Sequence, residues 1–179
     1  MKKTLLLLVI AGLFTSVKAQ EYSSPTRSVY AELGGAGLVY SFNYDFRFDN
    51  NRLDSWGIRV GAGGYAFDDK SLLTIPVQIN RLFGRNNHYF EIGAGATFVN
   101  FRKTGYDYDN NGNSVETESK EWHFILDVGE TPSVMGTLNF GYRRIPDEPG
   151  VTWRANLTPV FNGDGFWPLF AGIGIGYAF

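Results

Sequence analysis

One stretch of the chain has the spacing of a calcium-binding loop. In DYDNNGNSVETE, residues 107–118, oxygen-bearing side chains occupy positions one, three and five, glycine position six and glutamate position twelve. Hard oxygen ligands at this spacing can wrap one Ca²⁺ ion. The ligands would be Asp107, Asp109, Asn111 and Glu118. Against this site, an EF-hand has an apolar residue at position eight, where this chain has Ser114, and neither flank is typical of a helix.

The same residues also fit a β-hairpin, which we favour. Tyr106 and Tyr108 precede the Asn-Gly pair of Asn111 and Gly112, and Val115 follows it. Asn-Gly is a preferred pair for a two-residue hairpin turn. We therefore predict a hairpin that extends a sheet, and keep the calcium loop as the less favoured alternative.

A histidine in the same region is a second candidate for chemistry. The residues near His123 that could serve as nucleophile, base or orienting acid are Glu121, Asp127, Ser119 and Ser133. Such side chains are common in polar loops, and no motif joins these. We therefore predict that the protein is not an enzyme and has no catalytic residue and no cofactor. An enzyme site near His123 is the alternative.

The elements that must position these residues are strands. Apolar side chains alternate with polar or small ones, and a period of two is typical of a β-strand. This pattern covers the segments 29–34, 38–48, 56–63, 73–80, 90–99, 137–143, 151–161 and 169–179. Eight strands of about ten residues make the smallest closed barrel that crosses a bilayer. The sequence therefore predicts an all-β fold, a closed antiparallel eight-stranded up-and-down transmembrane β-barrel.

The last segment, LFAGIGIGYAF (169–179), favours closure of the barrel. It carries no charge, whereas a free edge strand is normally protected by Lys, Pro or a bulge. In a closed barrel the last strand pairs with the first, so no edge remains to be protected.

We predict that the apolar face points outward. An eight-stranded barrel has an interior just wide enough for side chains. The polar face consists mostly of Gly, Ser, Thr and Asn, whereas the apolar face of 38–48 carries Leu38 and five aromatic residues from Tyr40 to Phe48. The aromatic set is too bulky to be packed inside. The main rival is a soluble, secreted lipocalin-like binding barrel, whose apolar face would point inward.

Charged residues on the polar face would then lie in a narrow lumen. Unpaired charges there are costly, so we predict ion pairs that plug the barrel in place of an open pore. The three acids and four arginines are Glu32, Asp45, Glu91, Arg47, Arg59, Arg143 and Arg154.

Aromatic residues gather at one end of the predicted barrel. If the C-terminus is periplasmic, eight of them fall at the periplasmic ends of their strands, as in a girdle at a membrane interface. They are Phe46, Phe48, Trp56, Phe90, Tyr142, Trp153, Tyr177 and Phe179. The connections at this end, 49–55, 84–87 and 146–150, are short, and the long insertion 103–133 falls at the extracellular end.

The first 19 residues have the features of a secretory signal peptide. Two lysines precede an apolar run of about ten residues, too short for the ~20 that a spanning helix requires. A small-x-small pattern ends at Ala19, so we predict cleavage before Gln20 and a barrel domain over 20–179. The absence of cysteine excludes disulfides. Without the three lysines of this segment, 13 basic residues stand against 18 acidic ones, which argues against a nucleic-acid partner.

The strand pattern, the segments IPVQINRLFG and YFEIGAGATF, and the terminal GIGIGYAF resemble a known family. They are similar to small eight-stranded outer-membrane β-barrel proteins of Gram-negative bacteria, such as the OmpA transmembrane domain, over nearly all of 20–179. The resemblance implies an outer-membrane location, contact with membrane lipid and lipopolysaccharide, and recognition by the barrel-assembly machinery. It assigns the assembly signal to Phe179, with Tyr177 and Ile175 on the same face.

The resemblance also implies which reaction an enzyme site near His123 would catalyse, namely the modification of lipid A. Related barrels that deacylate or palmitoylate lipid A need a His with a Ser and an acid near the outer rim, where His123 is expected. The favoured function remains non-enzymatic: display of outer loops for envelope structure or extracellular contact. The aromatic and apolar loop residues that could bind a partner or cover the barrel mouth are Tyr106, Tyr108, Trp122, Phe124 and Ile125. We expect a monomer, and the sequence does not identify the extracellular partner.

Overall fold

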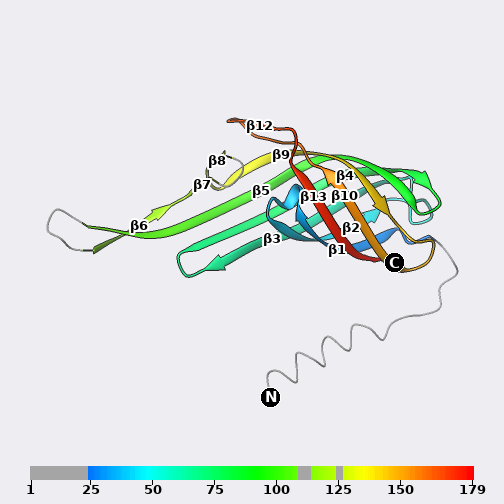
Figure 1. The fold of residues 1–179 in the computed structure, drawn as a ribbon, viewed down its shortest axis with the longest axis horizontal. Coiled ribbons are helices and arrows are strands. Elements are labelled where there is room, and N and C mark those ends of the chain that lie inside the picture. Colours follow the sequence, from blue (N-terminus) through cyan, green and yellow to red (C-terminus); the bar gives the residue numbers. More distant parts are fainter. Residues whose placement is uncertain (1–23, 109–113, 124–126) are drawn as a thin grey trace, which may run out of the picture.

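Eight long strands form the wall of a closed barrel in the computed structural model, which describes residues 24–108, 114–123 and 127–179 (Figure 1). The predicted signal peptide lies outside these residues. The wall strands are β1 (Arg27–Gly34), β2 (Tyr40–Arg47), β3 (Trp56–Phe67), β4 (Lys70–Arg85), β5 (His88–Tyr108), β9 (Ser133–Arg144), β10 (Gly150–Leu157) and β13 (Ala171–Ala178). Each pairs antiparallel with its neighbours, and the ring closes where β13 pairs with β1 and β5 with β9. The predicted closed eight-stranded barrel is confirmed.

The two ends of the barrel differ in their connections. The turns 48–55, 86–87 and 145–149 lie at one end, together with the C-terminus, and we call it the short-turn end. The opposite end, which we call the loop end, carries the longer connections between β5 and β9 and between β10 and β13. Among the described residues, no helix is long and apolar enough to cross a membrane.

Alternation along each strand decides which side chains face inward. On β4, Leu73, Ile75, Val77 and Ile79 are 37 to 45% exposed. Between them, the side chains of Thr74, Gln78 and Asn80 are buried, with at most 1% exposed. The apolar face therefore points outward, as predicted, and polar side chains occupy the interior.

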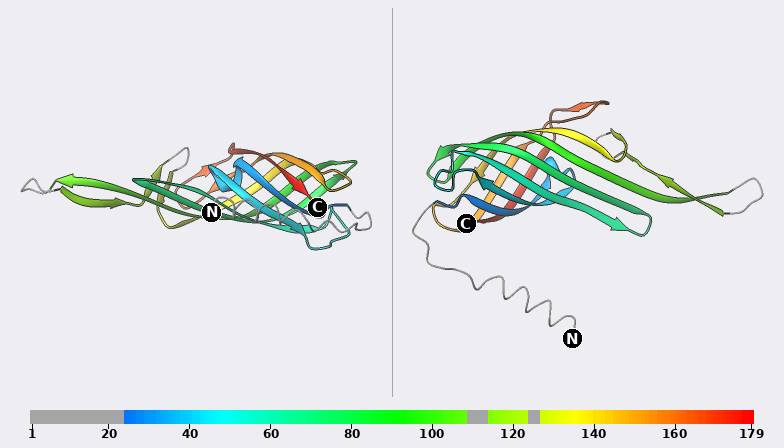
Figure 2. Two further views of the ribbon diagram at one scale, coloured as in Figure 1. Left: turned by 90° about the horizontal axis from the view of Figure 1, so that it is seen from below. Right: turned by 180° about the vertical axis from the view of Figure 1, so that it is seen from behind.

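Three wall strands continue beyond their predicted ends. β3 and β4 extend to a turn at Asp68 and Asp69, and β5 runs on to Tyr108 and pairs with β6 (Ser114–Ser119). Figure 2 shows this pair projecting well beyond the barrel. Two further strand pairs lie at the loop end: β7 (Glu121–His123) with β8 (Asp127–Glu130), and β11 (Val160–Phe161) with β12 (Phe166–Trp167).

The segment 151–161, expected as one strand, is interrupted. β10 ends at Leu157 and β11 begins at Val160. Pro159 between them has no N–H to donate to the ladder, although its carbonyl accepts a hydrogen bond from the Leu138 N–H at 2.9 Å. Pro159 and Val160 are buried, so the outward face predicted for Pro159 is wrong.

The turn between β1 and β2 folds into the barrel. Its 3-10 turn η1 (Gly35–Gly37) is buried, and positive φ angles of 68° at Gly34 and 60° at Gly35 let the chain reverse inward. The Thr97 hydroxyl donates to the Ala36 carbonyl at 2.6 Å, and the Thr74 hydroxyl donates to the Gly37 carbonyl at 3.0 Å. These bonds fix the turn between opposite walls.

The same turn corrects the prediction for Leu38. This residue was expected on the outward face, but it has a φ of 69° and is only 2% exposed. The reversal that begins at Gly34 brings Leu38 into the barrel mouth before β2 starts at Tyr40.

We expect Thr97→Val to destabilise the protein by about 1–3 kcal/mol, because the buried Ala36 carbonyl would lose its donor. Urea unfolding of protein refolded into lipid vesicles measures the change. Thr117→Val on the exposed strand β6 is the control and should leave stability unchanged. Equal stability of Thr97→Val and the wild type would contradict the assigned role of this bond.

Candidate functional site: the charged interior and the barrel mouth

The interior of the barrel holds a continuous chain of ion pairs. All seven charged residues predicted for the lumen are there, and each is at most 3% exposed. Acids and arginines alternate along the chain in the order Arg47, Asp45, Arg143, Glu91, Arg154, Glu32 and Arg59. We call this set the interior ion chain.

Arg143 links two acids near the short-turn end. Its Nη1 and Nη2 donate to the two oxygens of Asp45 at 3.1 and 3.2 Å. Its Nε lies 2.8 Å from Oε2 of Glu91, although that contact lacks hydrogen-bond geometry. The Asn80 amide donates to the second Asp45 oxygen at 2.6 Å, and Arg47 also binds Asp45. The Asp45 carboxylate therefore replaces its lost hydration with several donors, as a buried charge requires.

Arg59 anchors the other end of the chain. It donates to Glu32, to the Asn43 amide oxygen at 3.0 Å and to the Gln78 amide oxygen at 3.2 Å. Gln78 in turn donates to the Thr137 hydroxyl at 2.8 Å. Four strands meet through this one guanidinium, which is completely buried. The hydrogen bonds of Arg59 therefore hold the strands that carry its acceptors in fixed positions relative to one another.

Tyr30 is an interior residue that does not belong to the predicted charged set. Its ring centroid lies 5.4 Å from the Arg59 guanidinium carbon, 5.6 Å from that of Arg143 and 5.1 Å from that of Arg154. Arg154 also donates a hydrogen bond to the Tyr30 hydroxyl. Four arginines against three acids leave one excess positive charge, and the negative face of the ring favours cations. The signal was present, because alternation places Tyr30 on the same face as Glu32.

Apolar clusters cover the interior ion chain at both ends. The cluster at the loop end consists of Leu38, Leu72, Val99, Phe101, Trp122, Val128, Met135 and Val160. The cluster at the short-turn end consists of Leu82, Tyr89, Ile145 and Ala178. The charged layer is therefore enclosed between apolar layers.

The loop-end cluster settles the position of Trp122. Trp122 is only 4% exposed, and its ring lies 6.4 Å from that of Phe101. Of the two roles considered for the loop aromatics, Trp122 covers the barrel mouth. Tyr106 is 73% exposed. Phe124, Ile125 and the side chain of Tyr108 lie outside the described part of the chain.

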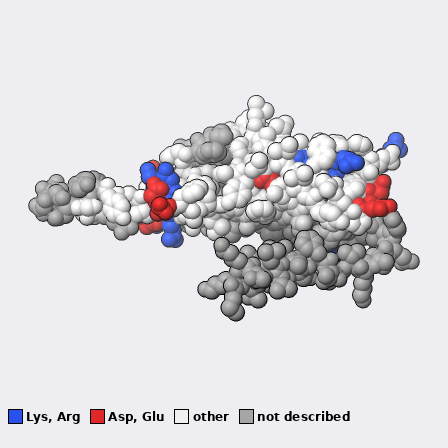
Figure 3. All heavy atoms as spheres, turned by 60° about the horizontal axis from the view of Figure 1, so that its bottom comes forward, with Lys and Arg blue, Asp and Glu red and all other residues white. Residues whose placement is uncertain are grey.

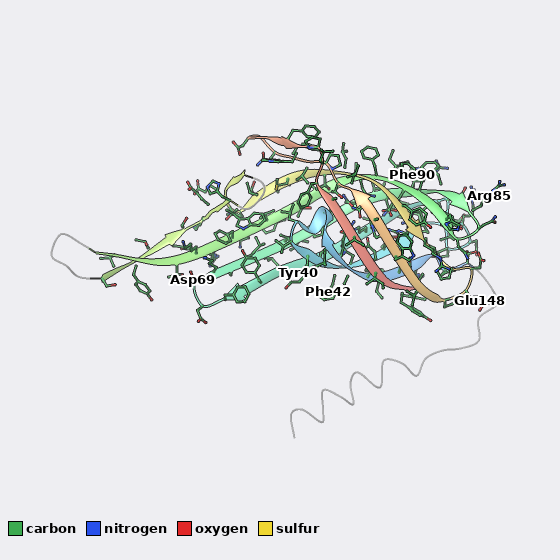
Figure 4. All side chains as sticks on the ribbon, viewed as in Figure 1. Tyr40, Phe42, Asp69, Arg85, Phe90 and Glu148 are labelled. Carbon is green, nitrogen blue, oxygen red and sulfur yellow. The ribbon has the colours of Figure 1, made fainter. Side chains whose placement is uncertain are left out.

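The eight aromatic residues predicted as a girdle all lie on the outward face toward the short-turn end. Six of them, Phe48, Trp56, Phe90, Trp153, Tyr177 and Phe179, are 39 to 58% exposed. The others are half-buried by neighbouring rings: Phe46 packs 6.2 Å from Phe48, and Tyr142 packs 4.9 Å from Trp153. Figure 4 shows Phe90 near this end, together with Arg85 and Glu148.

The residues predicted as the assembly signal share this outward face. Ile175 is 64% exposed, Tyr177 48% and Phe179 44%. Phe179 exchanges two backbone hydrogen bonds with Arg27, at 2.8 and 3.1 Å. The last residue therefore completes the pairing that closes the barrel.

The calcium loop remains a prediction. Asp109 and Asn111 lie outside the described residues, and the side chain of Asp107 is not described. On either side of this gap, β5 and β6 pair from Lys103 opposite Ser119 to Tyr108 opposite Ser114, which is the pairing of a hairpin. Glu118 is about half exposed, and its Oε1 lies 3.8 Å from Nε of Arg102. Among the described residues, no group of acids and histidines is placed to hold a metal ion.

The two histidines lie at opposite ends of the barrel. Nε2 of His123 is 3.7 Å from Oε2 of Glu121, and both side chains are exposed. Asp127 lies opposite His123 in the β7–β8 register, whereas Ser119 ends β6 and Ser133 begins β9. At the short-turn end, Nδ1 of His88 lies 2.6 Å from the Tyr142 hydroxyl.

We expect Glu91→Gln to cost about 3–5 kcal/mol of unfolding free energy, because it leaves Arg143 and Arg154 buried without their shared acid. The matched control is Glu118→Gln, whose exposed pair with Arg102 should contribute about 0–1 kcal/mol. Urea titration of both variants in vesicles measures the difference. Similar losses in the two variants would contradict an interior ion chain that holds the walls together.

Comparison with known proteins gives a likeness of fold. No family model matches the chain, and no curated protein matches it in sequence. Among solved structures, it is similar to the N-terminal β-barrel domain of Pseudomonas aeruginosa OprF, with a TM-score of 0.51 and 15% sequence identity. The match covers 89% of this chain and 100% of that chain. The resemblance suggested by the sequence thus holds at the level of the fold: the chain is a closed eight-stranded barrel like the OprF domain.

Proposed function

We propose that the protein is a non-enzymatic, integral outer-membrane β-barrel protein of a Gram-negative bacterium, with a plugged lumen and a displayed surface hairpin. The observation that carries this proposal is the apolar belt on the outside of a barrel that encloses the seven residues of the interior ion chain. The OprF barrel fold agrees with it. The predicted signal peptide would provide export.

The apolar belt supports a membrane position. Leu33, Phe42, Ile173 and Ile175 are 61 to 68% exposed, far more than a soluble barrel tolerates over a continuous face. In lipid this face is solvated by acyl chains, and the closed ring leaves no unpaired strand edge. On the face drawn in Figure 3, one group of charged side chains lies where the hairpin leaves the barrel and others lie toward the opposite end, with few charged atoms on the surface between them.

The interior supports a plugged lumen. The inward turn, the interior ion chain and the two apolar clusters together occupy the barrel. A void beside Tyr30 and Arg154, and another beside Asp45 and Arg47, measure about 10 Å³ each. Each has room for about one water molecule. Arginine and carboxylate side chains occupy the interior space in which a lipocalin-like barrel would hold an apolar ligand.

The loop end supports a role in contact or display. The β5–β6 hairpin carries Tyr106 and Val115 on its surface, 73% and 47% exposed. An extracellular partner would meet this hairpin first. We propose that the barrel contacts membrane lipid and lipopolysaccharide, is inserted by the barrel-assembly machinery through its terminal aromatic strand, and is monomeric. A lipid A-modifying enzyme with its site near His123 stays the alternative.

The proposal predicts that chain 20–179 folds only with an amphiphile. Refolding into phosphatidylcholine vesicles or detergent should give a form whose gel mobility shifts on boiling, because the intact barrel resists unfolding in the gel. The same chain diluted into plain buffer should aggregate and show no such shift. A folded, monomeric barrel in buffer without amphiphile would contradict the membrane position.

Conductance separates a plugged barrel from a pore. In planar bilayers, the refolded protein should show no large, stable channel openings, because the lumen is filled. Stable openings that persist in the wild type would contradict the plugged lumen and leave the membrane position intact.

A further inference from the structure

The outward face at the short-turn end carries arginines among its aromatic rings. Arg81 lies opposite Trp56 in the register of β3 and β4. Arg27, Arg85 and Arg144 occupy exposed positions near the same end of β1, β4 and β9. Within the described residues, none of these four arginines has a carboxylate within 4.0 Å. Arginines without an ion pair within 4.0 Å among the described residues therefore lie where the predicted girdle ends.

Arg81 is the most firmly positioned of the four. Its guanidinium carbon lies 5.9 Å from the ring centroid of Trp56 and 5.2 Å from that of Phe83. Its Nε donates to the backbone carbonyl of Asp54 at 3.0 Å. In the described part of the chain, neither terminal nitrogen donates to a protein acceptor. Two fixed donors are therefore available for a ligand.

The nearest carboxylates have other partners. Arg52 donates to both oxygens of Asp54, at 3.1 and 2.9 Å, and this hydrogen bonding lowers the pKa of Asp54. Asp49 accepts a hydrogen bond from the Asn51 N–H at 2.9 Å. The charge of Arg81 also lowers the pKa of Asp54, but no carboxylate oxygen of the described residues lies within 4.0 Å of the Arg81 nitrogens. Its terminal nitrogens can therefore still donate to an external anion.

A hollow of about 410 Å³ lies beside Arg81. Phe48 and Trp56 line it with aromatic surface, and its polar lining consists of two arginines, two acids and a serine: Arg52, Arg81, Asp49, Asp54 and Ser55. Because Arg52 is paired with Asp54, the groups left for an anionic head are the terminal nitrogens of Arg81, beside the aromatic wall.

We propose that this hollow binds the phosphate group of a membrane phospholipid, with the terminal nitrogens of Arg81 as its donors. Guanidinium groups match the paired oxygens of a phosphate, and aromatic belts lie at the level of lipid headgroups. The inference rests on the proposed membrane position, which brings phospholipid to this rim. Inorganic phosphate has the same chemistry and must be distinguished by experiment.

The test uses native mass spectrometry of the refolded mature protein in detergent micelles, titrated with phosphatidylglycerol. Arg81→Gln should bind the lipid about fivefold more weakly, the effect of one arginine at a lipid surface. Arg81→Lys should fall between Arg81→Gln and the wild type, because it keeps the charge but loses the planar pair of donors. The control is Arg102→Gln at the loop end, 63% exposed, which should bind like the wild type. A boiling-dependent gel shift checks that each variant is folded.

Each outcome decides the inference. A folded Arg81→Gln variant that binds lipid like the wild type overturns the site, and so does an equal loss in Arg102→Gln. An excess of inorganic phosphate that displaces the lipid from the wild type overturns the phospholipid as ligand and identifies a free-phosphate site. Lipid that inorganic phosphate does not displace, but that Arg81→Gln loses, supports the proposal. If the chain folds in plain buffer, the proposed membrane position is contradicted, and this result is distinct from a failure of the Arg81 site.

Discussion

The interior of an eight-stranded barrel is so narrow that every charge inside it must find its counter-charge within the lumen. In this protein the constraint is met by one alternating chain of arginines and acids. Its members come from β1, β2, β3, β5, β9 and β10. β4 contributes amide partners through Gln78 and Asn80. The glycines of β13 leave room for interior side chains. A Cβ atom at Gly174 would meet Arg154, and one at Gly176 would meet Tyr30. All eight strands thus depend on the same set of contacts.

The polar interior and the apolar exterior both follow from the alternation of side chains along the strands. At each end of the barrel, an apolar layer covers the charged interior. Leu82 and Ile145 cover the charged layer at the short-turn end, and Met135 and Trp122 belong to the layer that covers it at the loop end. These layers support the proposed plugged lumen. The sites proposed for other molecules both lie on the outside: the projecting hairpin of β5 and β6, and the rim where Arg81 lies between Trp56 and Phe83.

Much of this arrangement could be predicted from the sequence, because a period of two fixes both the strand and the face of each residue. Glu32 and Arg154 are interior for that reason alone. Their partners could not be predicted, because pairing across the lumen depends on the register of strands far apart in the chain, as with Arg143 and Asp45. Leu38 was misplaced because two glycines with positive φ reverse the chain before β2 begins. Trp122 is buried by apolar surface at the barrel mouth that no local pattern reveals. The extension of β5 was missed because charged residues such as Arg102 and Lys103 interrupt its alternation.

The central claim is that the apolar face of the barrel meets lipid while the interior ion chain stays enclosed by the wall. The chain has no cysteine, so a spin label on a single introduced cysteine at Ile75, Val77 or Ile79 reports on one position of the outward face of β4. In bilayers, collision rates with oxygen and with a water-soluble nickel chelate measure whether each label lies in lipid or in water. The account predicts labels at all three positions that oxygen reaches and the nickel chelate does not. Labels that the nickel chelate reaches freely at these positions, in protein verified as folded, would contradict it.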